Sequence, residues 1–362
     1  MNKRALRADI LLLLTAGIWG FGFVAQRSGM EYVGPFAFNG IRFILGSFSL
    51  LPFIFFRRNR LNRSRSGIAT APRRLLLSSL AAGSCLFTAV ILQQFGIIFT
   101  TAGNAGFITG LYVVLTPIFG IFLGRKTGYA TWIGSVLALT GLYFISAAGS
   151  HGSINPGDII IVVSAFFWTA HVLLIDRLMS SGQRDVSSDH SNVPSDYNNA
   201  SIEHDNVSNV SIDPLELSAG QFAVCGIFAL AGAFLAEPFV GAAVESINPS
   251  LLSAGLFEWQ PFPALVSALA AGTVSFPTAA IIPILYGGLG SVGIAYTFQV
   301  IAQRDAPPAH ATIILNFEGC FAALGGVLLL SEKAGTWTLL GFFFMLAGML
   351  ATQWEVVAKA RG

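Results

Sequence analysis

The chain has 362 residues, of which 54% are hydrophobic and only 10% are charged, and its net charge is +2. Soluble domains usually carry about 25% charged residues. So few charged groups cannot cover a water-facing surface, which excludes an ordinary soluble domain and predicts a protein whose solvent is lipid. The small net charge also gives no support to a nucleic-acid partner.

Ten stretches are apolar enough to cross a bilayer core, which takes about 20 mostly apolar residues in a helix. The first covers residues 9–26 and follows a basic N-terminal segment. It lacks a small-residue cleavage site, so we interpret it as an uncleaved transmembrane helix rather than a signal peptide. The other nine lie near residues 33–56, 75–99, 102–124, 129–147, 158–175, 215–236, 279–302, 308–330 and 336–355.

The loops between these spans differ sharply in basic residues. With the N-terminus in the cytoplasm, nearly all of the 20 Lys and Arg residues fall at the cytoplasmic ends of the spans. Positive charge is enriched in cytoplasmic loops. The sequence therefore predicts a multi-pass protein of the cell (inner) membrane with both termini cytoplasmic.

Two of the loops are long. Residues 176–214 are polar and poor in aromatic residues, a composition that is typical of disorder. Residues 237–278 contain no Lys or Arg but include two apolar stretches that are too short to span. We expect those stretches to lie flat on the outer surface.

An internal repeat divides the chain into residues 1–150, with spans one to five, and residues 151–362, with spans six to ten. A shift of 149 aligns Trp19 with Trp168, and a shift of 207 aligns Gly134 and Gly141 with Gly341 and Gly348. Five spans are an odd number, so the second half is inverted relative to the first. Inverted repeats are the build of many secondary transporters, with the solute site near the midplane between the halves.

The segments that carry this repeat resemble a known family. "GIWGFGFVAQ", "LQQFGIIFTTAGNAGFITGLYVVLTPIFG", "PLELSAGQF" and "GIAYTFQVIAQRDAPPAHATIILNFEGC" are similar to an EamA-type permease of the drug/metabolite transporter superfamily. The resemblance implies an all-α membrane fold of ten helices, in which helices one to four and six to nine surround a central cavity. It also implies that the fifth helix of each half packs outside, where a homodimer would form. The family's usual Glu-Pro pair reads Glu318-Gly319 here.

Two charged residues fall deep inside spans. Arg42 lies about 14 Å from the outer end of span two, and Glu318 lies about 15 Å into span nine, at 1.5 Å per helical residue. Both are close to the midplane of a core about 30 Å thick. Charge at this depth is costly, so each residue is a functional candidate by default. Their opposite signs predict either an ion pair or the two poles of a solute site; for both residues, a purely structural role stays open.

Uncharged candidates complete the expected site. His171 shares one face of span six with Trp168, and it titrates near neutral pH when solvated. The repeat-related Trp19 and Trp168 offer flat faces for stacking. Amide side chains occur within other spans, and an amide without a partner is costly in lipid. The amides that we expect to reach the cavity or to bond between helices are Gln94, Asn104, Gln299 and Asn316, together with the neighbouring Gln93.

These observations favour a secondary active transporter or exporter of a small metabolite or drug-like solute, working by alternating access. A proton or Na⁺ is the expected coupling ion, and membrane lipid is the other partner. No GxxxxGK[ST] phosphate loop, catalytic motif, metal-ligand spacing or cofactor motif occurs in the sequence, which argues against direct use of ATP and against an enzyme. A lipid flippase or a non-transporting membrane scaffold is the alternative.

Overall fold

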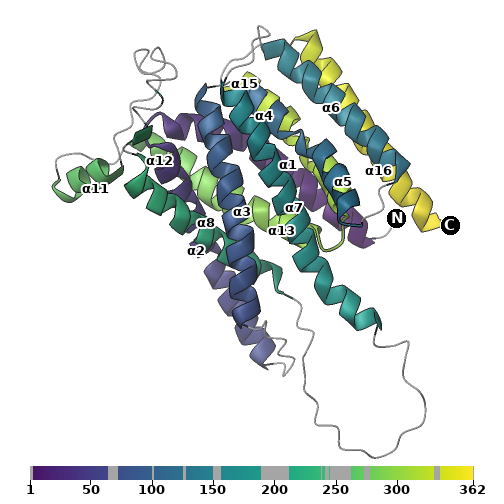
Figure 1. The fold of residues 1–362 in the computed structure, drawn as a ribbon, viewed down its shortest axis with the longest axis horizontal. Coiled ribbons are helices and arrows are strands. Elements are labelled where there is room, and N and C mark those ends of the chain that lie inside the picture. The colour runs from purple at the N-terminus through teal and green to yellow at the C-terminus, as the bar shows by residue number, and fades with distance from the viewer. Residues whose placement is uncertain are drawn as a thin grey trace, which may run out of the picture.

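The protein folds into a bundle of helices, seen here in a computed structural model (Figure 1). The structure describes residues 3–63, 72–99, 102–124, 128–149, 156–188, 212–237, 239–240, 244, 262–272, 278–329 and 335–361. The first half contains α1 (Lys3–Met30), α2 (Pro35–Arg63), α3 (Pro72–Phe99), α4 (Ala102–Thr109), α5 (Tyr112–Phe122) and α6 (Tyr129–Gly149). The second half contains α7 (Pro156–Ser188), α8 (Pro214–Leu235), α11 (Phe262–Ala270), α12 (Thr278–Leu285), the π-helix η1 (Tyr286–Tyr296), α13 (Thr297–Ala302), α14 (Pro308–Leu315), α15 (Glu318–Leu329) and α16 (Thr336–Arg361).

Helix covers each of the ten expected spans. Seven segments of the described chain are continuous, long and apolar enough to cross a membrane: α1, α2, α3, α7, α8, the run from α12 to α13 and the run from α14 to α15. The fourth span is divided between α4 and α5, and the fifth and tenth are α6 and α16. The protein is therefore an all-α membrane protein.

The second helices of the two halves, α2 and α8, pack against each other along their length. Gly40 abuts Leu230, and Gly226 abuts Ile44, so the paired positions run in opposite directions along the two helices. The Ser47 hydroxyl also donates to the carbonyl oxygen of Ala219 at 2.8 Å. Glycines at these crossings let the backbones approach closely, as is common between membrane helices. This antiparallel contact is the geometry of inverted repeats.

The fifth helices, α6 and α16, form a second antiparallel pair at one edge of the bundle (Figure 1). A side chain at Gly141 would collide with the backbone of Gly341, and a side chain at Gly348 would collide with that of Gly134. The four glycines that the sequence repeat aligns are thus the ones that make the contact. Both helices lie beside the helices around the centre, as the resemblance implies.

Spans four and nine are each divided into two helices. We did not expect a break in span four from the sequence. A turn at Gly110 and Leu111 separates α4 from α5, and a turn at Asn316 and Phe317 separates α14 from α15. The break in span nine forms although Gly319 replaces the family's proline. It leaves Glu318 as the first residue of α15 rather than in the middle of a helix.

Pro117 interrupts the helical hydrogen bonding of α5, because proline has no N–H to donate to the carbonyl oxygen four residues earlier. That carbonyl belongs to Val113, and it accepts a hydrogen bond from the Ser135 hydroxyl on α6 at 3.2 Å instead. The backbone group freed by the proline is thus satisfied inside the bundle, as the membrane interior requires.

The two long loops are described in part. Helix α7 continues to Ser188, so the first stretch of the expected polar loop is helical. The disorder expected further on concerns residues 189–211, which lie outside the described residues. In the second loop, the apolar stretch that begins at Phe262 forms α11, and its Phe262 ring contacts the Phe234 ring of α8 with 5.2 Å between centroids.

Candidate functional site

A cavity with about 490 Å³ of empty space lies between the two halves of the chain. Its lining comes equally from residues 1–150 and residues 151–362. The lining residues are Trp19, Phe23, Gln26, Arg42, Gln93, Thr109, Tyr112, Trp168, Val172, Ser291, Tyr296, Gln299, Leu315 and Glu318.

The two broken spans meet at this cavity. Thr109 and Tyr112 flank the break between α4 and α5, while Leu315 and Glu318 flank the break between α14 and α15, and all four line the cavity. The Tyr112 hydroxyl donates a hydrogen bond to Glu318 Oε1 at 3.3 Å, which joins the two half-helices across the repeat. Discontinuous helices that meet near the midplane are a recurrent feature of transporter solute sites.

Arg42 and Glu318 both line the cavity but do not form an ion pair with each other among the described contacts. Glu318 is 5% exposed and bonds to Tyr112, whereas Arg42 is 2% exposed and donates from Nε to Asn39 Oδ1 at 2.9 Å. Of the two arrangements that the sequence left open, the geometry therefore favours separate poles over a direct pair.

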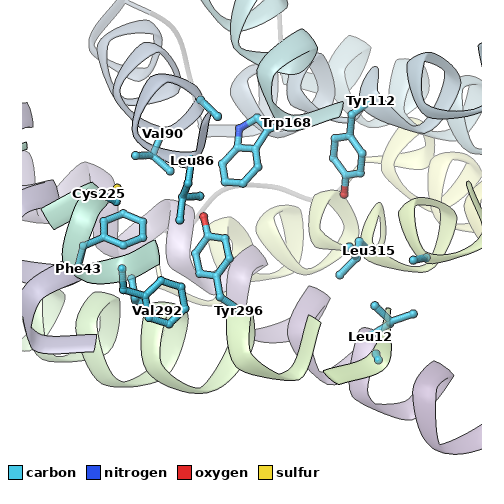
Figure 2. Close-up of a cluster of buried hydrophobic side chains, with 14 of the residues drawn as sticks. Leu12, Phe43, Leu86, Val90, Tyr112, Trp168, Cys225, Val292, Tyr296 and Leu315 are labelled. Carbon is cyan, nitrogen blue, oxygen red and sulfur yellow. The ribbon is translucent and has the colours of Figure 1, made fainter. Parts of the chain in front are cut away.

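Three aromatic rings form one wall of the cavity. Tyr296 stacks against Trp168 with centroids 6.1 Å apart (Figure 2), and the centroid of its ring lies 4.5 Å from that of Trp19. The indole N–H of Trp19 donates to the carbonyl oxygen of Ser291 in the π-helix at 3.2 Å. That bond fixes the Trp19 ring, so this wall presents flat apolar surface with one anchored indole.

Some of the predicted amides line the cavity, and others are buried elsewhere in the bundle. Gln299 lines the cavity, and neither its amide oxygen nor its amide nitrogen has a hydrogen-bond partner among the described residues. Gln94 and Asn316 are fully buried but do not line the cavity, and their amides also lack partners there. Gln93, next to Gln94, lines the cavity and donates to the Thr109 hydroxyl at 3.0 Å. The side chain of Asn104 lies outside the described residues.

His171 lies behind the aromatic wall rather than in the cavity lining. Its ring meets the rings of Trp168 and Tyr296 edge-on, and Nε2 lies 2.9 Å from Gln221 Oε1. The side chain is completely buried. Gln221 lies seven residues after Pro214, just as Arg42 lies seven residues after Pro35, so a repeat alignment with a shift of 179 places Gln221 at the position of Arg42. His171 therefore fits the structural role that is common for a histidine on an apolar helix face, and the structure separates it from the cavity residues.

Several cavity residues were missed by the sequence reasoning. Tyr112, Tyr296 and Thr109 carry no charge and lie in spans rich in similar residues, so residue type alone did not distinguish them. The position of Tyr112 could have identified it, because it lies near the middle of span four, at the same expected depth as Glu318. Gln26 was overlooked because it lies close to the end of the first expected span.

Comparison with known proteins agrees with this architecture. The family model for the EamA-like transporter family matches residues 6–147 and 242–353. An uncharacterized transporter of Archaeoglobus fulgidus is 32% identical over 173 residues, which are 48% of this chain and 50% of that protein. The uncharacterized inner membrane transporter YedA of Escherichia coli K12 is 27% identical over 42% of this chain and 47% of its own length.

Other relatives extend the same picture. The uncharacterized transporter YdfC of Bacillus subtilis is 29% identical over 46% of this chain and 52% of its own length. The chain thus spans about half the length of the curated relatives that it matches. A solved crystal structure superposes with a TM-score of 0.63 at 13% identity, covering 95% of this chain and 96% of that one. At that identity the likeness concerns the fold alone.

Proposed function

Since the chain belongs to the EamA-like transporter family, we propose that it is a secondary active transporter that moves a small metabolite or drug-like solute across the cell membrane by alternating access. The observation that carries this proposal is the cavity at which the broken spans of both halves meet. In this account, residues 1–150 and 151–362 rock against each other around a fixed central site, as inverted repeats do.

Glu318 is the proposed coupling group. It is the first residue of a half-helix, it lines the cavity, and its bond to the Tyr112 hydroxyl connects the two halves. A carboxyl group in this position can exchange a proton or bind a cation as the cavity opens to each side in turn. Occupation of the carboxylate then alters the contact between α5 and α15, which links the ion to the movement.

The experiment is transport by purified protein in vesicles, after an efflux screen over metabolite classes in a deletion strain has identified a solute. We expect Glu318→Gln to fold normally and to lose the transport driven by an imposed pH gradient. Glu31→Gln, which alters an exposed carboxylate outside the cavity, serves as the matched control. A parallel arm with an Na⁺ gradient distinguishes the two coupling ions. Gradient-driven transport by Glu318→Gln at the wild-type rate would rule out the coupling role.

The orientation in the membrane belongs to the same proposal. We propose that both termini lie in the cytoplasm, and the distribution of Lys and Arg supports this orientation. Reporter fusions after residues 60 and 362 are expected to score as cytoplasmic, and a fusion near residue 255 as external. An external score at residue 362 would contradict the orientation.

A further inference from the structure

Arg42 is a buried cation for which the protein supplies no countercharge among the residues that the structure describes. Its side chain is 2% exposed and lies within the second span. Ion pairs within the described residues include those of Arg57 with Asp213, Arg58 with Glu216, and His310 with Asp9, and Arg42 has no acidic partner among the described residues. A guanidinium removed from water is costly unless it is paired with an anion.

The guanidinium is held in a fixed orientation. Its Nε–H donates to Asn39 Oδ1 at 2.9 Å, and the Asn39 amide nitrogen in turn donates to the carbonyl oxygen of Pro35 at 2.9 Å. The rings of Phe43 and Phe38 lie 5.1 and 5.5 Å from the guanidinium carbon. Arginine has five N–H donors, so the four on the two terminal nitrogens remain for other partners. The side chain lines the cavity.

The second half of the chain has no cation at the position that corresponds to Arg42 in the repeat. Gln221 stands at the corresponding position of the second half and bonds to His171 behind the aromatic wall. The cavity therefore carries its cation on the first half alone. Glu318, the carboxylate that lines the cavity, is already bonded to Tyr112. Arg42 lines the same cavity as Trp19, Trp168 and Tyr296.

We infer that Arg42 binds an oxyanion of the transported solute, and that the solute combines a carboxylate or phosphate group with a flat apolar body. The planar fork of arginine matches both oxyanions and binds each through two hydrogen bonds. The flat body would stack on the aromatic wall while the anion supplies the charge that Arg42 lacks. Asn39 is then a positioning residue that acts through Arg42. This inference rests on the proposed function, since it assigns a substrate class to the same cavity.

The test compares four probes that share a phenyl ring: phenylacetate, phenyl phosphate, the neutral phenylacetamide and the cationic phenethylamine. Binding to the detergent-purified protein is followed by the change in tryptophan fluorescence, to which the cavity residues Trp19 and Trp168 contribute. We expect at least one of the two anions to bind about tenfold more tightly than the amide, the scale set by hydrogen bonds to a charged group. The amine is expected to bind no better than the amide. The two anions show which oxyanion the site prefers.

Variants assign the preference to Arg42. Arg42→Gln should bind the anions and the amide equally, while Arg42→Lys should retain part of the preference. Asn39→Ala should weaken anion binding with the charge still present. The matched control Arg304→Gln removes one positive charge at an exposed position outside the cavity and should keep the full preference. Thermal unfolding of each variant reports whether it is folded.

Some outcomes would overturn the inference. These are equal binding of anions and amide by the wild-type protein, no binding of either anion, or an unchanged preference in Arg42→Gln. The wild-type comparison stands even if Arg42→Gln fails to fold. Failure of this inference is distinguishable from failure of the proposed function. Alternating access can be tested by labelling a cysteine placed in the cavity from each side of the membrane, and that result does not depend on the charge of the solute.

Discussion

The carboxylate of Glu237 accepts a hydrogen bond from the backbone N–H of Ala37, with 3.2 Å between Oε1 and the amide nitrogen. The same oxygen also accepts from the N–H of Phe36 at 3.1 Å. Glu237 follows the end of α8, and the two amides belong to the first turn of α2, so one half of the chain caps a helix of the other. The partial positive charge of the helix N-terminus favours the ionised carboxylate there, whereas burial of the side chain disfavours it.

The stability of the protein should depend on pH through Glu237, which lies just outside the span that ends at Leu235. Burial raises the pKa of its carboxyl from 4.5 to about 7, although the backbone amides of Ala37, Phe36 and Phe262 act in the opposite direction. Because the folded-state pKa is the higher one, folding favours the protonated form. The stabilisation is complete below pH 4.5 and is lost as the pH rises through 7, by up to about 3 kcal/mol.

Glu237→Gln tests this dependence. Glutamine keeps an oxygen that can accept from Phe36 and Ala37 but has no charge to bury. Thermal unfolding in detergent, compared at pH 5 and pH 8, should show a smaller loss of stability at pH 8 for the variant than for the wild-type protein. Arg27 and Glu31 are the charged residues at the nearby end of α1, so Glu31→Gln is the control and should keep the wild-type dependence. An unchanged dependence in Glu237→Gln would refute the assignment.

An ion pair joins α2 and α8 at the opposite end of their contact. Arg57 Nη1 lies 2.8 Å from Asp213 Oδ2, and Asp213 also accepts from the backbone N–H of Leu215 at 2.9 Å as the N-cap of α8. Loss of an N-cap costs about 1 kcal/mol, whereas an exposed ion pair contributes less. Asp213→Ala should therefore lower the free energy of unfolding by more than Arg57→Ala does.

Asp213→Asn separates the two roles, because asparagine can cap the helix but cannot pair with Arg57. We expect its stability to match that of Arg57→Ala, measured by thermal unfolding. Equal losses for Asp213→Ala and Arg57→Ala would show that the cap contributes nothing beyond the ion pair.

The contact between α6 and α16 should fail when Gly141 is enlarged. A Cβ at this position would lie 2.5 Å from the carbonyl oxygen of Gly341 and 2.5 Å from Met345 Cγ. Overpacking of a close contact typically costs about 1–3 kcal/mol. Gly141→Ala should lower the unfolding temperature, and Gly141→Leu should lower it further. Gly335→Ala is the matched control, because, apart from its chain neighbours, no atom of the described residues lies within 4 Å of its Cβ position. Equal unfolding temperatures for Gly141→Ala and Gly335→Ala would contradict this packing.

The sequence was sufficient for the large-scale fold because hydropathy and glycine spacing act locally. The repeat alignment pairs Gly134 with Gly341 and Gly141 with Gly348, and these four glycines form the contact between α6 and α16. The expected depths of Arg42 and Glu318 came from counting residues along a span, and both residues line the same cavity. These properties need no knowledge of how the helices pack.

The finer features depend on packing that a linear pattern does not encode. The turn at Gly110 and the π-helix from Tyr286 to Tyr296 arise within stretches as apolar as their neighbours. Adjacent Gln93 and Gln94 differ in that Gln93 lines the cavity, a distinction set by the rotation of α3 against α7 and α4. His171 was attractive by residue type, yet its partner Gln221 lies 50 positions away in the chain.

The most direct test of alternating access is the reactivity of a single cysteine in the cavity. Thr109 lines the cavity and is 2% exposed, and the native Cys85, Cys225 and Cys320 can be replaced by serine or alanine to provide a background. Thr109→Cys should react with a membrane-impermeant maleimide in both right-side-out and inverted vesicles. Ala138→Cys, which is buried where α6 packs against Val113 and Ile313 and lies outside the cavity, should react in neither type of vesicle. Reaction of Thr109→Cys in one vesicle orientation alone would contradict alternating access at this cavity.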